Sequence, residues 1–194
     1  MLSNTFDAKV TFIGTAEVMF DRYAGDNKTQ LPVEQKMYLT HKKEIYLPSL
    51  NLISMLSATN TQSAPKMFLQ PKEYKPVADA MAACTCITPN QILFIRNDKP
   101  IIFGEFAEQD DGVLIDKKSG MYVDCRVARL DKGIPNPKVR PVLTLPWELK
   151  FRLQVAPHEQ LGDDLIKSLL TKAGLFLGIG TYRKVYGKFE VQFG

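Results

Sequence analysis

A glycine-rich stretch near the C-terminal end holds the residues best suited to binding chemistry. Gly178 and Gly180 are followed closely by basic and aromatic residues, namely Tyr182, Arg183, Lys184, Tyr186 and Lys188. Glycine lets a backbone turn tightly and lets a phosphate approach it, cations attract phosphate, and flat rings stack on bases. This mixture favours a single-stranded nucleic acid over a small metabolite. The alternative is a glycine that ends a helix, followed by an ordinary edge strand.

A second group of basic residues precedes this stretch. It comprises Arg126, Arg129, Lys132, Lys138 and Arg140, with Asp131 as the one acidic residue among them. The net charge of +4 is therefore unevenly distributed, because acidic residues outnumber basic ones up to residue 116 and basic residues are twice as numerous beyond it. Clustered cations are expected of a surface that binds phosphates. A solvated surface that keeps the protein in solution is the alternative.

No pair of residues has the spacing of a catalytic site. The sequence has two histidines, His41 and His158. His41 stands beside Lys42 and Lys43 and is a candidate general base for an RNase that works without metal, with an ordinary surface position as the simpler interpretation. His158 is expected at the start of the last helix. We therefore predict a protein without catalytic residues.

Metal and cofactor sites are not expected either. Cys84 and Cys86 have no second pair at zinc-site spacing, so two core thiols are predicted, and Cys125 stands alone. The acidic pairs at 110–111 and 163–164 have the ligand type for Mg²⁺, but neighbouring acids on a turn or helix are usually solvated. No phosphate-binding loop, nucleophile elbow or metalloprotease motif is present.

Length and composition favour one domain in a reducing compartment. The chain has 194 residues, 45% of them hydrophobic, which is enough for a core. No apolar run reaches the ~18 residues of a membrane span, and the N-terminal residues lack the features of a signal peptide. With three cysteines and no disulfide spacing, we expect a cytoplasmic protein without a membrane partner.

Hydrophobic periodicity predicts a mixture of strands and helices. Extended segments are expected at 8–13, 38–47, 84–95 with a break at Pro89, 101–106, 121–130, 147–155 and 185–193. Helices are expected at 50–56, 74–83 and 159–172, the first of them capped by Ser49. Loops or turns are expected at 21–35, 59–65, 97–98 and 108–112. Residues 131–141 contain Pro135, Pro137 and Pro141, and are predicted to form an exposed tip rather than a strand.

These elements form two units of strand, helix and strand. The first uses the strand at 8–13, the helix at 49–57 and the strands near 84–95, and the second uses 143–155, 159–173 and 184–193. The order is that of a ferredoxin-like or RRM-like α+β fold with an antiparallel sheet. We predict a single domain over 1–194 with an insertion at about 97–141, from which a basic hairpin projects.

The chain resembles the RAMP superfamily, the RRM-like proteins that form the backbone of CRISPR effector complexes. Three features carry the resemblance: the strand–Pro48–Ser49–helix join, the basic hairpin that ends at Arg140 and Pro141 before Trp147, and the ending of helix, glycine loop and strand over 174–189. The helix entry departs from the family pattern because no glycine precedes Ser49. A relative carried by a phage or other mobile element fits the short chain equally well.

The resemblance implies binding of guide-type RNA, assembly of copies along the strand, and a hairpin that acts as a thumb. It also implies contact of Ser49 with the strand's backbone. We therefore predict a non-catalytic protein that binds single-stranded nucleic acid, preferably RNA, as a homo-oligomer or as a subunit of a ribonucleoprotein. The alternatives are a self-assembling or partner-docking protein without nucleic acid, and a processing endoribonuclease. The sequence does not distinguish RNA from DNA, because recognition of the 2′-hydroxyl depends on side-chain placement.

Overall fold

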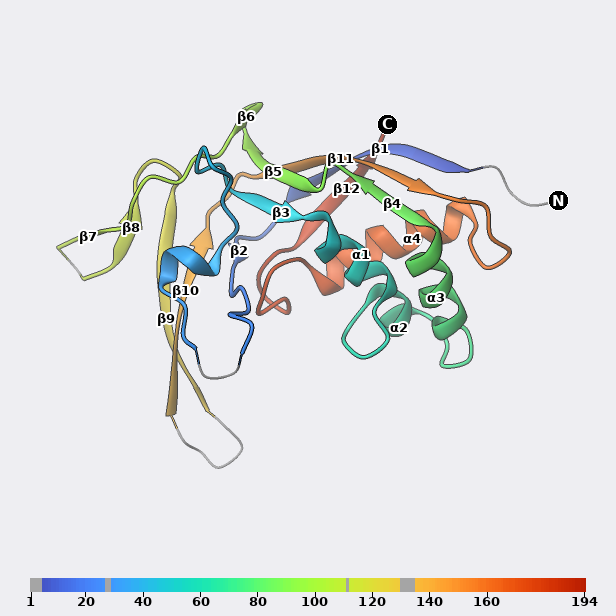
Figure 1. The fold of residues 1–194 in the computed structure, drawn as a ribbon, viewed down its shortest axis with the longest axis horizontal. Helices are drawn as coiled ribbons and strands as arrows, with labels where there is room; N and C mark the ends of the chain where they lie inside the picture. Colours follow the sequence, from blue (N-terminus) through green and yellow to red (C-terminus); the bar gives the residue numbers. More distant parts are fainter. Residues whose placement is uncertain (1–4, 27–28, 111, 130–134) are drawn as a thin grey trace.

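The computed structural model describes residues 5–26, 29–110, 112–129 and 135–194. Over these ranges the chain has an α+β fold with two antiparallel sheets and four α-helices (Figure 1). The helices lie together on one face of the larger sheet, and the smaller sheet extends away from it as a long hairpin (Figure 1).

The larger sheet has the strand order β12-β1-β11-β5-β3, with β4 also paired to β11 and β6 paired to β5. Its strands are β1 (Phe6–Gly14), β3 (Tyr46–Pro48), β4 (Thr85–Thr88), β5 (Gln91–Arg96), β6 (Lys99–Pro100), β11 (Glu148–Val155) and β12 (Phe189–Phe193). The central pair is β1 and β11, which run antiparallel in continuous register from Phe6 opposite Val155 to Ile13 opposite Glu148. The predicted strands at 8–13 and 147–155, and the break at Pro89, are confirmed.

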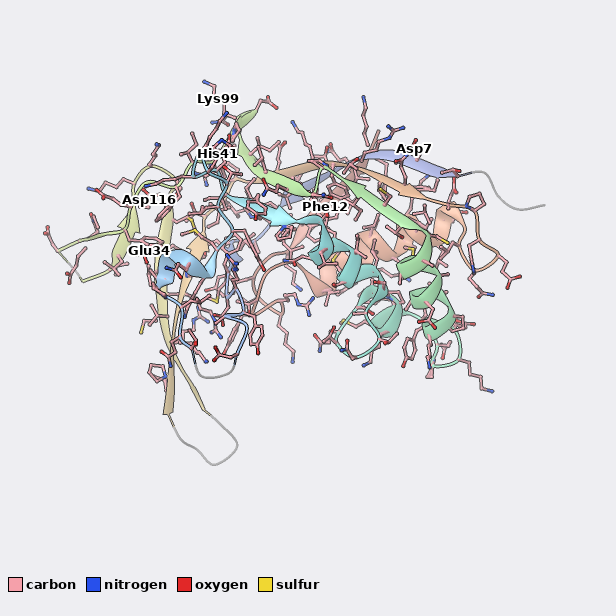
Figure 2. All side chains as sticks on the ribbon, viewed as in Figure 1. Asp7, Phe12, Glu34, His41, Lys99 and Asp116 are labelled. Atoms are coloured by element: carbon pink, nitrogen blue, oxygen red, sulfur yellow. The ribbon has the colours of Figure 1, made fainter. Side chains whose placement is uncertain are left out.

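The core lies between this sheet and the helices. The helices are α1 (Ser49–Ser57), α2 (Ala64–Phe68), α3 (Tyr74–Cys84) and α4 (Asp163–Lys172), and α4 continues into a π-helical turn, η2 (Ala173–Leu177). Alternate residues of β1 and β11 point to the helices and are buried, and Phe12 at the centre stacks on Phe189 with 3.9 Å between ring centroids (Figure 2). Lys9, Lys150 and Arg152 lie on the opposite, solvent-exposed face.

The smaller sheet has the order β2-β10-β9-β8-β7. Its strands are β2 (Val18–Met19), β7 (Ala107–Glu108), β8 (Leu114–Asp116), β9 (Met121–Arg129) and β10 (Pro135–Leu143). Strands β9 and β10 form an antiparallel hairpin that projects away from the larger sheet (Figure 1). The predicted strand at 121–130 is confirmed over β9.

Arg96 joins the base of this hairpin to the larger sheet. Its guanidinium donates to three backbone carbonyls, those of Pro146 at 2.8 Å, Ser119 at 2.7 Å and Thr144 at 2.8 Å. Burial lowers the pKa of Arg96 from its ordinary value. One side chain of β5 therefore holds both the turn before β9 and the segment that follows β10.

The prediction that prolines exclude a strand over 131–141 is wrong for the described part, because β10 contains Pro135, Pro137 and Pro141. These prolines are an even number of residues apart, so their nitrogens point to the same edge of the strand. That edge faces away from β9, since the carbonyl of Pro141 accepts from the amide of Phe20 rather than from β9. The missing amide hydrogens therefore do not interrupt the β9–β10 pairing.

Three other segments also differ from expectation. Residues 38–47 reverse direction instead of staying extended, because Lys43 has a positive φ of 62° and the Thr40 hydroxyl accepts from the amides of Lys42 and Glu44. Residues 101–106 make a single bridge, Ile102 to Glu44, rather than a strand. The predicted loop at 59–65 gives way to α2 from Ala64.

The ends of the last unit are also shifted. Helix α4 begins at Asp163 rather than at 159, and β12 begins at Phe189 rather than at 185. The four-residue apolar spacing of this helix is confirmed, since Leu169 and Ala173 are buried in the core. The delayed strand leaves residues 178–188 as a loop.

Asp116, at the end of β8, is a buried carboxylate that organises the turn before β9 (Figure 2). It accepts from the amide of Gly104 at 2.9 Å, from the amides of Lys118 and Ser119, and from the Ser119 hydroxyl. Burial acts to raise the pKa of Asp116, but these hydrogen bonds outweigh it and leave the pKa below its ordinary value.

We therefore expect Asp116→Asn to lower the free energy of unfolding by about 1–3 kcal/mol at neutral pH, because the amide cannot accept all of these bonds. A carboxyl whose pKa is lower in the folded state stabilises the protein above its unfolded pKa and loses that contribution as the pH falls through the folded pKa. Urea denaturation should show the difference between variant and wild type shrinking below about pH 4. A difference that is absent at pH 7, or that grows in acid, would contradict this role.

Candidate nucleic-acid interface

The loop 178–188 lies between the helices and the hairpin (Figure 1). It is held by backbone hydrogen bonds to β2 and to the residues that connect β1 to β2. The amide of Thr181 donates to the carbonyl of Met19 at 2.8 Å, and the amide of Gly187 donates to that of Glu17 at 2.6 Å. The structure thus brings together the two basic regions identified in the sequence, the loop and the hairpin.

The glycines of this loop are packed against the protein's own backbone. Gly178 and Gly180 have φ values of 77° and 76°. A side chain at Gly180 would collide with the carbonyl of Met19, and one at Gly178 would lie 2.8 Å from the carbonyl of Tyr186. The close approach that glycine permits here is therefore the approach of another segment of the chain.

Tyr186 is buried, with 6% of its surface exposed, so its ring does not offer a free face to a base. The Arg126 guanidinium from β9 lies 5.4 Å from the centre of that ring and donates to its hydroxyl. Arg126 also pairs with Asp124, which raises the pKa of Arg126. On the same side of the hairpin, the Tyr122 hydroxyl donates to Glu17 at 2.9 Å. Tyr186 and Arg126 thus fasten the loop to the hairpin.

Arg140 makes a similar connection from β10. It is 8% exposed, and its Nε donates to a carboxylate oxygen of Asp21 at 2.7 Å. Lys36 approaches the same carboxylate at 3.9 Å. The Arg140 guanidinium also lies 5.2 Å from the ring centre of Tyr182, which remains 44% exposed. Tyr182 therefore keeps an accessible surface, whereas the charge of Arg140 is neutralised.

The remaining cations of the loop have a different environment. Arg183, Lys184 and Lys188 make no ion pair with a carboxylate of the described residues. Arg183 is half-buried, and burial lowers its pKa. The Lys188 ammonium donates to the carbonyl of Phe176 at 2.7 Å, and both burial and the nearby Arg183 lower its pKa. Lys184 is exposed.

The other predicted interface residues are dispersed. Lys138 lines a groove of about 630 Å³ between residues 21–36 and β10, together with Arg22 and Lys36. Arg129 is the last residue of β9, and its side chain lies outside the described part of the structure. Lys132 lies outside the described residues. Ser49 is buried as the first residue of α1, and Pro48 occupies the cap position, so the predicted cap at Ser49 is wrong.

The histidines and cysteines do not form a cluster. His41 lies on the turn before β3, apart from the loop 178–188 (Figure 2). His158 accepts from the amide of Gln160 in the turn before α4 rather than at the helix start. Cys84 ends α3 and Cys86 is exposed, so the predicted pair of core thiols is wrong. No group of three or more potential metal ligands occurs among the described residues.

Sequence reasoning missed the carboxylates that divide the cations into two classes. Asp124 and Arg126 are two residues apart on one strand, so their side chains point to the same face of β9. The sequence alone could therefore have predicted that they pair. The partner of Arg140 is Asp21, far away in the sequence, and only the folded structure reveals that pair. The separation into neutralised hairpin arginines and unneutralised loop cations is thus a structural finding.

Comparison with known proteins adds no relative. No known protein family and no curated protein matches the chain. Within the described ranges, none of the helices has the length and apolar character needed to span a membrane.

The ion pair of Arg140 leads to a prediction about stability. Arg140→Ala should lower the free energy of unfolding by about 1–3 kcal/mol, because it removes the closest counter-charge of Asp21 and leaves Lys36, 3.9 Å away, to neutralise it. Lys184→Ala removes an exposed cation without an ion pair, so it should change the free energy of unfolding by less than about 0.5 kcal/mol. Urea denaturation of both variants tests the distinction, and equal stabilities would refute it.

Proposed function

We propose that the protein binds single-stranded nucleic acid, preferably RNA, through the loop 178–188, and that it does not cut the strand. The observation behind the proposal is that Arg183 and Lys188, two partly buried cations of this one loop, have no carboxylate partner among the described residues. Exposed Lys184 and the accessible ring of Tyr182 adjoin them.

The electrostatics of this pair favour a bound anion. Burial disfavours the charged form of each side chain, and the two like charges disfavour one another. A phosphate between them would relieve both effects. It would also supply acceptors for the guanidinium, which has five N–H donors, and for the two ammonium hydrogens that remain after Lys188 bonds to Phe176.

The proposed fold is ferredoxin-like, of the RRM-like kind seen in the RAMP superfamily. The order β12-β1-β11-β4, antiparallel throughout, with α1 and α4 on one face, supports it. The β9–β10 hairpin would serve as a thumb, and copies would assemble along the strand. Lys138 lines the groove beside β10, where Arg22 and Lys36 are accompanied by Asp21 and Asp26, and would add one further contact to such a strand.

The competing function is a self-assembling or partner-docking protein that binds no nucleic acid. Absorbance at 260 and 280 nm of protein purified in low salt separates the two. Co-purifying nucleic acid supports the proposal, and its length distribution would report a repeating footprint. A clean protein that still forms large particles supports the alternative.

The loop cations should control the salt dependence of binding. We expect Arg183→Gln combined with Lys188→Gln to weaken binding of a labelled single strand, because cations that bind phosphates release counterions. The slope of log affinity against log salt should become shallower by about 0.7 for each phosphate that the variant no longer neutralises. Fluorescence anisotropy over a salt series measures both effects.

The matched control is Arg152→Ala, which removes an exposed arginine that pairs with Asp7 on the opposite face of the sheet. Its affinity and slope should equal those of the wild type. An unchanged slope in a folded double variant would remove the loop from the binding surface.

Absence of cleavage is a separate expectation. Labelled RNA incubated with the protein should stay intact with and without Mg²⁺, since no convincing acid–base pair lies near the loop cations in the part of the chain that the structure describes. RNA cleavage that His41→Ala abolishes would instead support the processing endoribonuclease.

A further inference from the structure

The π-helical turn η2 presents two large apolar side chains to solvent. Leu175 is 55% exposed and Phe176 is 62% exposed, whereas their neighbours Gly174 and Leu177 are buried. Such turns inside or at the end of α-helices occur frequently at functional sites. An exposed phenylalanine has a cost in water, so its position calls for a physical reason.

Phe176 is held in place rather than free. Its ring lies 6.1 Å from that of Phe68 in α2, at an angle of 55°. Its carbonyl accepts from the ammonium of Lys188. The ammonium of Lys188 therefore adjoins the turn that carries Phe176, which places an exposed apolar side chain next to a partly buried cation.

We propose that Phe176 stacks on an unpaired base of the strand whose phosphate is bound by Arg183 and Lys188. The inference rests on the proposed function and names its substrate more closely, as a nucleotide unit with a free base. A base has an apolar face and a phosphate has a negative charge, and this surface complements both. Duplexes, whose bases are stacked on one another, would be bound less well.

Adjacency to the cations favours a base over an apolar protein partner. A hydrophobic partner would have to bury the cations Arg183 and Lys188 or leave them at its border without a counter-charge. A nucleotide supplies that counter-charge from the same molecule. Tyr182, which is stacked with Arg140 and partly exposed, is placed to contact a neighbouring base along the strand.

The test compares four variants in fluorescence anisotropy with a labelled oligouridine, a strand of equal length with abasic sites, and a duplex. Phe176→Ala and Phe176→Leu should each lose about 5- to 160-fold in affinity for oligouridine, which corresponds to about 1–3 kcal/mol for one stacked base. Phe176→Trp should retain affinity because it keeps a flat ring. Leu175→Ala, the matched control, should bind like the wild type.

Two further readouts separate stacking from other roles. On the abasic strand all four variants should bind like the wild type, and the salt slope on oligouridine should not change, since every phosphate keeps its cation. Wild-type affinity for the duplex should be lower than for oligouridine.

The inference is overturned if Phe176→Ala binds oligouridine like the wild type, or if Phe176→Leu restores full affinity. It is also overturned if the loss of affinity persists on the abasic strand, or if Phe176→Ala breaks a wild-type oligomer in sedimentation, which would make the surface a protein interface. A wild type that binds none of the probes refutes the proposed function itself, an outcome distinct from failure of Phe176 alone.

Discussion

Backbone hydrogen bonds between residues 15–19 and residues 181–188 fix the loop cations relative to both sheets. The amides of Thr15 and Ala16 donate to the carbonyl of Lys188, while the carbonyls of Glu17 and Met19 accept from the loop. Since residues 15–17 connect β1 in the larger sheet to β2 in the smaller one, and Met19 belongs to β2, the loop is held where the two sheets meet. Glycine is required at this contact: Gly180 and Gly187 both have positive φ, and a side chain at either would collide with a backbone carbonyl.

Charge neutralisation separates the arginines that support the fold here from the cations of the proposed binding surface. Two hairpin arginines whose side chains are described, Arg126 and Arg140, have carboxylate partners and contact aromatic rings, so they stabilise the contact between hairpin and loop. Arg183 and Lys188 have no such partner among the described residues, and they repel one another. A phosphate bound as proposed would supply the missing counter-charge. Basic residues that look equivalent in the sequence thus fall into two groups. One group has a structural role, and the other has the proposed role in binding.

The strands that are buried on one face and exposed to solvent on the other can be predicted from the sequence. Alternation is clear in β1 and β11 because one side packs on helices and the other meets water. The proline-containing strand β10 was not predicted, because proline density disfavours a strand unless the proline nitrogens point away from the partner strand, as they do here with respect to β9. The sequence shows which residues are basic or aromatic in the loop and the hairpin. Whether a basic residue is neutralised depends on partners far away in the sequence, such as Asp21 for Arg140. Phe176 stands in the apolar run 175–177, which is indistinguishable from core by pattern, and its exposure follows from the π-helical turn.

Binding at the loop is tested most directly by ultraviolet cross-linking of the wild-type protein to a single-stranded RNA, followed by mass spectrometry of the cross-linked peptides. Direct photo-cross-linking favours residues whose rings contact bases, and it requires no substitution that could perturb the fold. We predict cross-links concentrated in residues 174–188, at Phe176 or Tyr182. Cross-links confined to strands β9 and β10 or to the exposed face of the larger sheet would contradict binding at the loop, as would a strand that does not bind.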